Sequence, residues 1–207
     1  MFGNMPKVTI GRIKGAAIGL LILTSLASTA LKANEKAADM LFDDFTSDTL
    51  ITKVGTQWRG VSDQVMGGVS QATVTRQNEA GRTFLRLSGD VRLDNNGGFI
   101  QAAANLASSD STFDASGYTG IRLEVRGNGE QYSLHLRTPD NTRPWQSYRA
   151  HFTAGPDWRV IELAFADFKP YRVDAPLDTS NLRRMGLVAI GRAFMADLSV
   201  SNISFYR

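Results

Sequence analysis

The spacing of apolar residues is the feature that most constrains the fold of this chain. Apolar and polar residues alternate through residues 118–126, where Ile121, Leu123 and Val125 share one side, and again through residues 131–137. Such alternation is typical of a half-buried β-strand. Strand-like segments also occur at 41–45, 70–76, 83–93, 97–106, 148–152, 158–165, 185–190 and 198–205. About ten strands without a sustained helical period predict an all-β domain, either a two-sheet sandwich or a barrel.

Glycine, asparagine, aspartate and proline cluster between these segments, which is where turns are expected. The clearest turns are Asn-Asn-Gly-Gly at residues 95–98, Gly-Asn-Gly at 127–129 and Ala-Gly-Pro-Asp at 154–157. We expect residues 127–129 to form a hairpin turn that joins the strands on either side.

The N-terminus has the features of a targeting segment. Lys7, Arg12 and Lys14 form a basic start, residues 15–31 carry no charge, and small residues lead up to Ala30. This order is typical of a secretory signal peptide. The uncharged run is shorter than the roughly 20 residues of a membrane span, which favours cleavage over anchoring. An uncleaved membrane anchor is the alternative.

These observations divide the chain into three parts. We expect a signal peptide over residues 1–30, a polar linker over 31–40 and one folded domain over 41–207. The domain is then exported, periplasmic or secreted, or held at the membrane if the N-terminal segment stays.

Charge and cysteine content exclude several classes of protein. Three of the 23 basic residues lie in the predicted leader, which leaves 20 basic residues against 20 acidic ones. A nucleic-acid-binding domain would carry a basic excess, so we expect no nucleic-acid partner. The chain has no cysteine, which rules out disulfides, thiolate zinc sites and thiol nucleophiles. No G-x-S-x-G elbow or phosphate-binding loop before a helix is present, so we expect no cofactor and no enzyme activity.

The segment WRGVSDQVMGGVS at residues 58–70 is the most unusual in the chain. It reads as a strand, a sharp bend and a second strand, with a glycine pair that permits positive φ angles or close backbone approach. We expect Asp63 to accept backbone N–H bonds in the bend. Trp58 and Met66 are expected to pack in the core.

This segment resembles the signature of the complex I intermediate-associated protein 30 family, named for an assembly factor of mitochondrial NADH:ubiquinone oxidoreductase. Three further elements agree in order: Asn96-Gly97-Gly98-Phe99, residues 118–132, and a Trp158 to Pro170 segment with Ala164 where a proline is usual. The resemblance covers residues 41–207. It implies a galactose-binding-like jelly roll, the fold of many carbohydrate-binding modules, and no set of catalytic residues.

A polar sheet face is the main candidate for binding. If Leu134 and Leu136 point inward, the residues between them point outward. The face is then expected to gather the cationic side chains Arg122, Arg126, Arg137, Arg149, His135 and His151 around Glu124. Arginines suit carboxylates or phosphates, and Trp145 or Tyr148 would stack beside the ligand. A simply solvated face is the alternative.

Metal sites have little support in the sequence. His135 and His151 form a possible pair, but no further ligand lies at a suitable spacing. Asp43 and Asp44 could join a structural calcium site, although an acidic pair at a strand edge is usually solvated. We expect no metal.

Two functions remain open. The favoured one is a non-catalytic binding domain that mediates protein association or assembly at the cell envelope. The alternative is a binder of sugars or other polar ligands that resembles a carbohydrate-binding module. The candidate binding residues are Trp58, Asp63, Ser70, Arg137, Trp145, Tyr148 and Arg149, and the candidate structural residues are Met66, Gly67, Gly68, Gly97, Gly98 and Phe99.

Overall fold

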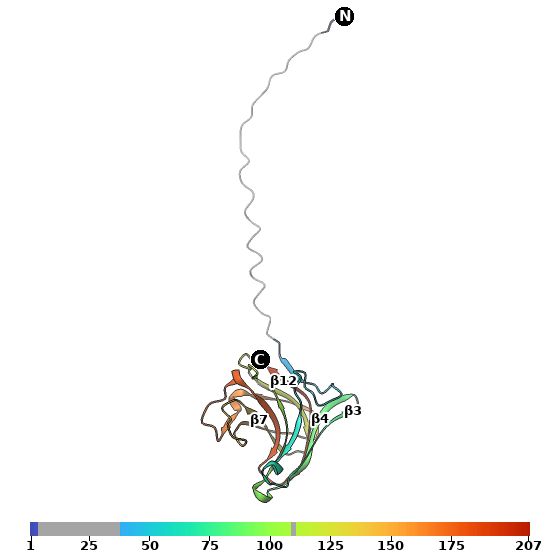
Figure 1. Cartoon of the computed structure of the whole chain (residues 1–207). Helices are drawn as coiled ribbons and strands as arrows, with labels where there is room; N and C mark the ends of the chain where they lie inside the picture. Colours follow the sequence, from blue (N-terminus) through green and yellow to red (C-terminus); the bar gives the residue numbers. More distant parts are fainter. Residues whose placement is uncertain (4–37, 109–110) are drawn as a thin grey trace. The chain divides into compact units, whose positions relative to one another are not determined.

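The computed structural model describes residues 1–3, 38–108 and 111–207 (Figure 1). The compact unit is Ala37–Arg207. The predicted signal peptide falls almost entirely outside the described residues. Among the residues described, no helix combines the length and hydropathy that a membrane crossing requires.

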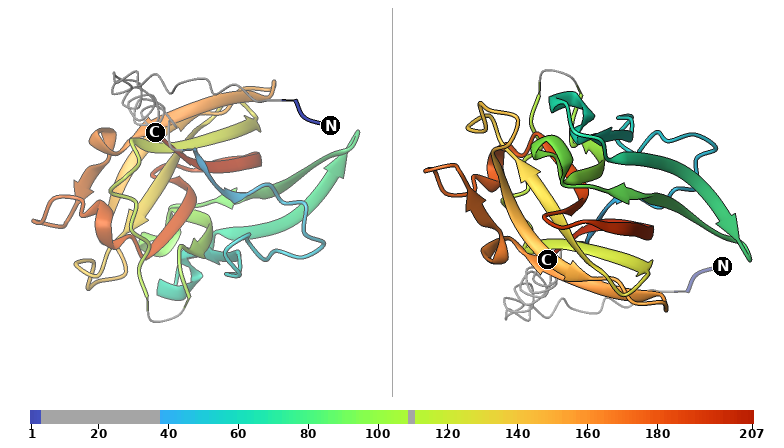
Figure 2. Two further views of the ribbon diagram at one scale, coloured as in Figure 1. Left: turned by 90° about the horizontal axis from the view of Figure 1, so that it is seen from above. Right: turned by 90° about the horizontal axis from the view of Figure 1, so that it is seen from below.

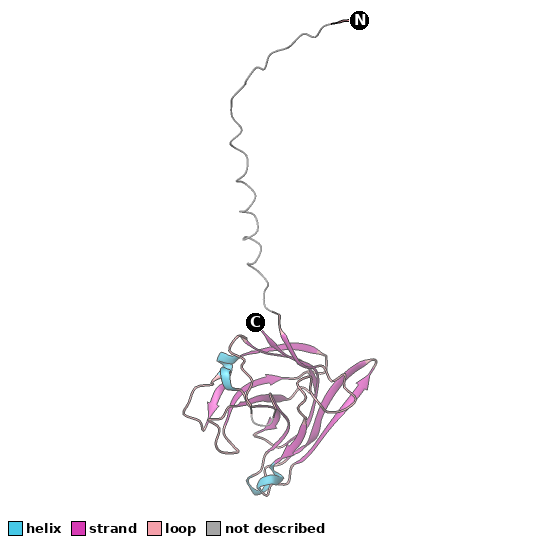
Figure 3. Cartoon of the chain, turned by 45° about the horizontal axis from the view of Figure 1, so that its top comes forward, coloured by secondary structure: helices cyan, strands magenta, loops and turns pink. Residues whose placement is uncertain are grey.

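The domain is an all-β sandwich of two antiparallel sheets, as the sequence predicted, and its helical segments are only short turns (Figure 3). The first sheet has the order β3-β4-β12-β6-β9, and β1 pairs with the far half of β12. Its strands are β1 (Met40–Asp43), β3 (Gln71–Glu79), β4 (Arg82–Val91), β6 (Gly120–Gly127), β9 (Arg159–Ala164) and β12 (Phe194–Tyr206). The β3–β4 hairpin projects at one corner of the sandwich (Figure 2).

The second sheet has the order β10-β8-β7-β11-β5-β2. Its strands are β2 (Arg59–Ser62), β5 (Phe99–Asn105), β7 (Gln131–Arg137), β8 (Ser147–Thr153), β10 (Lys169–Tyr171) and β11 (Arg184–Ile190). The edge strand β10 was not predicted, since it has three exposed residues with Pro170 among them, and proline is tolerated only at such edges.

The core lies between the two sheets and follows from the alternation in the sequence. Ile121, Leu123 and Val125 of β6 are fully buried, as are Leu134 and Leu136 of β7 in the opposite sheet. Full burial of such a side chain stabilises the fold by about 1.5–3 kcal/mol. Removal of apolar surface from water therefore holds the two layers together without disulfides.

The turn at residues 127–129 differs from the prediction. It does not close a hairpin, because β6 pairs with β12 and β9 whereas β7 pairs with β11 and β8. The turn instead carries the chain from one sheet to the other, and Gly127 and Gly129 donate backbone hydrogen bonds to Gly155 and Ala154. A side chain at Gly127 would collide with the backbone of Asp197.

Candidate functional site

Asp63 is the centre of the 58–70 segment, and its carboxylate is fully buried. It accepts hydrogen bonds from the Ser70 backbone N–H at 2.9 Å and from the Ser70 hydroxyl at 2.5 Å. It also accepts from the backbone N–H groups of Gly98 at 2.6 Å and Phe99 at 3.3 Å. Burial opposes ionisation, but these hydrogen bonds lower the pKa of Asp63. The carboxylate therefore ties Ser70, at the end of its own segment, to Gly98 and Phe99 at the start of β5, which is a wider role than the predicted local turn. We call this set of hydrogen bonds the Asp63 clamp.

The glycines around Asp63 make room for this clamp. A Cβ at Gly68 would collide with the Asp63 carboxylate, and one at Gly97 would lie 2.5 Å from its Oδ2. Gly67 has φ +88° with open space around it, so its role is conformational. Met66 was expected in the core but is 52% exposed, because it sits in the short 3-10 turn that Ser62 caps.

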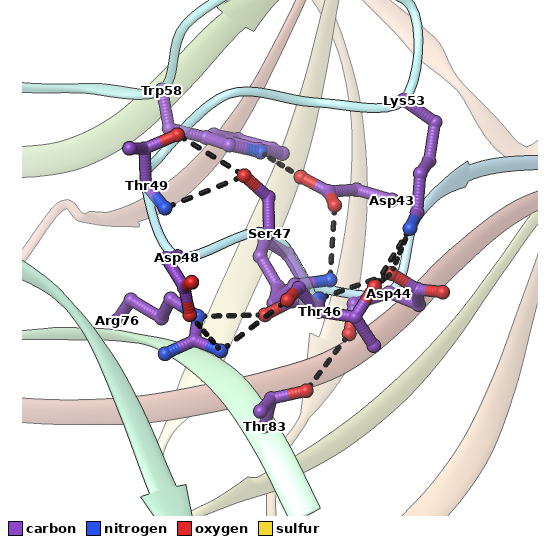
Figure 4. Close-up of polar contacts among 11 residues, drawn as sticks. Asp43, Asp44, Thr46, Ser47, Asp48, Thr49, Lys53, Trp58, Arg76 and Thr83 are labelled. Atoms are coloured by element: carbon purple, nitrogen blue, oxygen red, sulfur yellow. Dashed lines mark hydrogen bonds and ion pairs between the residues drawn. The ribbon is translucent and has the colours of Figure 1, made fainter.

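Trp58 lies in the core, as predicted, and is buried against Phe42 and Phe45. Its Nε1–H donates to Asp43 Oδ2 at 2.8 Å (Figure 4). Trp58, Asp63 and Ser70 are all inside the domain. A partner therefore cannot touch these three predicted binding residues directly.

Asp44, the other half of the acidic pair, already has cationic and hydroxyl partners. Lys53 Nζ lies 2.8 Å from its Oδ1, and Thr46 donates both its N–H and its hydroxyl (Figure 4). Against the effect of partial burial, these contacts lower the pKa of Asp44 to about 2. No cluster of three metal-ligating side chains occurs in the part of the chain that the structure describes.

The predicted polar face combines residues that in fact belong to different sheets. Arg122, Glu124 and Arg126 lie on β6 in the first sheet, whereas the predicted residues of β7 and β8 lie in the second. The prediction was wrong here because the 127–129 turn crosses between the layers. Glu124 pairs with Arg82 at 2.5 Å, and Arg126 pairs with Glu79 of β3.

The two sheets differ sharply in their charges. Each arginine of β3, β4 and β6 has an acidic partner, for example Arg86 with Asp197 at 2.7 Å. The six strands of the second sheet contain no aspartate or glutamate. They carry Arg59, Arg137, Arg149, Lys169 and Arg184 together with His135 and His151. Within the described residues, none of these takes part in an ion pair with a carboxylate.

Strand register aligns these residues on the outer face of the second sheet. One row crosses all six strands and consists of Lys169, Arg149, His135, Gly186, Ala103 and Arg59. Arg137 of β7 and Arg184 of β11 are paired with each other, two residues from His135 and Gly186 of that row. They therefore project from the same face. We call these outward residues the basic face.

Arg149 and Arg137 are held in place by their surroundings. The Arg149 guanidinium lies 3.5 Å from the centroid of the Tyr171 ring, and its Nε donates to the Ser147 hydroxyl. Arg137 donates to the backbone carbonyls of Asn141, Arg143 and Pro144 and so fixes the loop before β8.

Like charges and burial perturb the groups of the basic face. Burial, with Arg183 and Arg184 nearby, lowers the pKa of Arg137 to about 10. Burial, with Arg149 and His151 nearby, lowers the pKa of His135 to about 3. Its Nε2 atom is buried without a hydrogen-bond partner among the described residues. An anion on this face would relieve the repulsion among these groups.

The two predicted stacking residues have different positions. Trp145 is 47% exposed in the loop that Arg137 holds, and its carbonyl lies 3.5 Å from the Arg149 guanidinium. Tyr148 is fully buried on the opposite side of β8, and its hydroxyl donates to carbonyl oxygens of Ala175 and Pro176. The structure therefore brings Arg137, Arg149 and Trp145 together and leaves Tyr148 out. The sequence analysis did not predict Arg59 and Arg184 as site residues. Both lie on strands that contain no acidic residue, which was the available signal.

Solved structures of carbohydrate-binding modules share this fold. The family 11 module of a cellulosomal cellulase of Clostridium thermocellum matches with a TM-score of 0.62 and 14% identity, covering 82% of this chain and 94% of the module. A family 11 module from Clostridium thermocellum in complex with a β-1,3-1,4-mixed-linked tetrasaccharide matches with a TM-score of 0.61 and 15% identity, covering 81% of this chain and 95% of the module. A family 30 module of another Clostridium thermocellum cellulosomal cellulase gives 0.55 and 18%, covering 81% and 96%. At these identities the likeness establishes the fold alone.

The sequence comparison gives the family. No match was found among curated proteins. Residues 44–200 match the complex I intermediate-associated protein 30 family, in agreement with the motifs at residues 58–70 and 96–99. This match spans well over half of the chain, which therefore belongs to the complex I intermediate-associated protein 30 family.

Proposed function

We propose that this protein is a non-catalytic binding domain of the assembly-factor type, which associates with an acidic surface of another protein through the basic face. The observation that carries the proposal is the sheet with five cationic strand residues and no carboxylate. Repulsion and burial raise the free energy of clustered guanidinium groups that have no counter-charge. A partner that supplies carboxylates would remove that cost and gain charge-assisted hydrogen bonds.

The predicted leader supports a proposal for the location of the domain. We propose that the domain works outside the cytoplasm, in the periplasm or as a secreted protein, because the N-terminal sequence has the order of a signal peptide. Retention of that segment would instead tether the same domain to the membrane.

A second candidate is an acidic glycan as the ligand of the basic face. The shared fold with carbohydrate-binding modules and the exposed Trp145 beside Arg149 favour it. An indole ring offers an apolar surface for a sugar ring, and the arginine supplies the pairing for a uronate.

Crosslinking followed by pull-down from the native cell envelope tests the proposal. We expect the full chain to recover a protein partner, and Arg149→Glu to abolish recovery by reversing one charge of the basic face. Arg86→Glu is the matched control, because it reverses an arginine on the other sheet. Recovery of no protein, together with retention on a uronate resin, would replace protein association with the glycan candidate.

A further inference from the structure

A hollow of about 460 Å³ opens at the end of the basic face that is formed by β2, β5 and β11. Arg59 and Arg184 contribute the charge, and the polar lining includes Gln57 and Asn105. Its apolar wall is made of short or slender side chains: Ile51, Ala103 and Ala107. No aromatic and no acidic side chain lines the hollow among the described residues.

Strand register brings the two arginines to this hollow. Arg59 of the edge strand β2 pairs with Ala103 of β5, and Arg184 of β11 pairs with Asn105, two residues further along β5. Between the two arginines, β5 therefore presents the methyl group of Ala103 and the short amide side chain of Asn105. This leaves space above β5 with a guanidinium group on either side.

Neither arginine has a counter-charge among the residues that the structure describes. Arg59 is exposed, whereas Arg184 is only partly exposed. Within the described part of the chain, the Arg184 guanidinium takes part in no ion pair. Burial lowers its pKa first, and the positive charges of Arg183 and Arg59 lower it further.

We infer that the hollow between Arg59 and Arg184 binds a carboxylate of an acidic segment of the partner protein, an inference that rests on the function proposed above. Two guanidinium groups form bidentate, charge-assisted hydrogen bonds with a carboxylate. The wall of Ala103, Ala107 and Ile51 accommodates the methylene groups of a glutamate side chain. Gln57 and Asn105 supply amide donors and acceptors for the adjoining peptide backbone.

The lining favours a peptide over a sugar. An aromatic side chain offers a flat apolar surface on which a sugar ring can stack, and the hollow has no aromatic ring in its described lining. The exposed aromatic residues Trp145 and Tyr171 lie beside Arg149, in the loop before β8 and on β10. The hollow lies on the far side of β7, between β2 and β11. The glycan candidate would therefore centre on Arg149, and the carboxylate site on Arg184.

The test measures binding of a glutamate-rich peptide to the purified full chain at low salt, by calorimetry and by amide chemical shifts. We expect Arg184→Gln and Arg59→Gln each to weaken binding about tenfold, the loss expected for one charge-assisted hydrogen-bonding group. Arg82→Gln, on the other sheet, is the control and leaves affinity unchanged. Shift changes are expected at Ala103 and Ala107.

The possible negative results distinguish the inference about the hollow from the proposed function. In one outcome, Arg149→Gln weakens peptide binding whereas Arg184→Gln and Arg59→Gln do not. That result would overturn the hollow as the carboxylate site but would leave the proposed function standing. Equal binding of inorganic phosphate would reduce the hollow to a simple anion site. Binding of an oligouronate but not of the peptide would overturn both the inference and the protein partner. Circular dichroism of each variant confirms that it is folded.

Discussion

Asp63 Oδ2 accepts a hydrogen bond at 2.6 Å from the backbone N–H of Gly98, a residue 35 positions away in the sequence. This contact ties the 58–70 segment to the second glycine pair at the start of β5. β5 in turn pairs with β2 and β11 and lines the hollow between Arg59 and Arg184. The 58–70 segment therefore fixes the start of β5, whereas the hollow is lined by the other end of that strand, at Ala103 and Asn105.

Loss of the Asp63 carboxylate should destabilise the domain strongly. Asp63→Ala leaves the buried donors of Ser70, Gly98 and Phe99 without an acceptor, and we expect a loss of about 3–5 kcal/mol in the free energy of unfolding. Asp63→Asn keeps one carbonyl oxygen and should cost less. Urea unfolding at pH 7 measures both, and a loss below about 1 kcal/mol for Asp63→Ala would refute the clamp.

The same clamp makes stability depend on acid pH. The folded pKa of Asp63 lies below its ordinary value, so its stabilising contribution is fully present above the unfolded pKa of about 3.9. That contribution is lost as the pH falls through the folded pKa. Wild type should therefore lose more stability than Asp63→Asn when the pH drops from about 5 to about 3.

His135 should dominate the pH dependence at milder acidity. Its folded pKa is about 3, well below the unfolded value of about 6.5. At pH 5 the His135 imidazole is therefore protonated in the unfolded chain but neutral in the folded protein. The free energy of unfolding should be about 2 kcal/mol lower at pH 5 than at pH 7. His135→Asn removes this difference, whereas replacing the exposed His151 by asparagine keeps it. If the unfolding curves of wild type and of both histidine variants shift equally with pH, His135 is not the source of the pH dependence.

The glycine pair offers a graded comparison. Gly68→Ala places a methyl group against the Asp63 carboxylate, and overpacking of this kind costs about 1–3 kcal/mol or more. Gly67→Ala has open space but a positive φ, so about 1 kcal/mol is expected. Met66→Gln, at an exposed position, should change stability by less than about 0.5 kcal/mol. Thermal unfolding that ranks Met66→Gln as the worst of the three would place Met66 in the core after all.

Much of the fold was accessible from the sequence because it rests on local alternation. β7 was predicted with its observed bounds, and Leu134 and Leu136 point inward as expected. Alternation tells which residues of a strand share a face, but it does not tell which sheet the strand joins. The 127–129 turn suits a hairpin and a crossing equally well in composition, and so Arg122 and Arg126 were assigned to the wrong face.

The candidate site was only partly predictable for the same reason. Arg137, Arg149 and Trp145 follow from one pair of neighbouring strands. Arg59 and Arg184 join them through pairings with β5, across long stretches of sequence. The absence of acidic residues is visible in six separate segments, but it acquires meaning only when these segments form one sheet. The net charge of the predicted mature domain, near zero, concealed that separation.

The location of the binding surface is the central claim, and two triple variants of equal charge change test it most directly. One replaces Arg59, Arg149 and Arg184 with glutamine on the basic face; the other replaces Arg82, Arg86 and Arg126 on the opposite sheet. Dissociation constants for a glutamate-rich peptide are measured for both at low salt. We expect the first variant to lose at least about a hundredfold in affinity and the second to stay near wild type. Equal losses in both would mean that net charge, and not the basic face, governs binding.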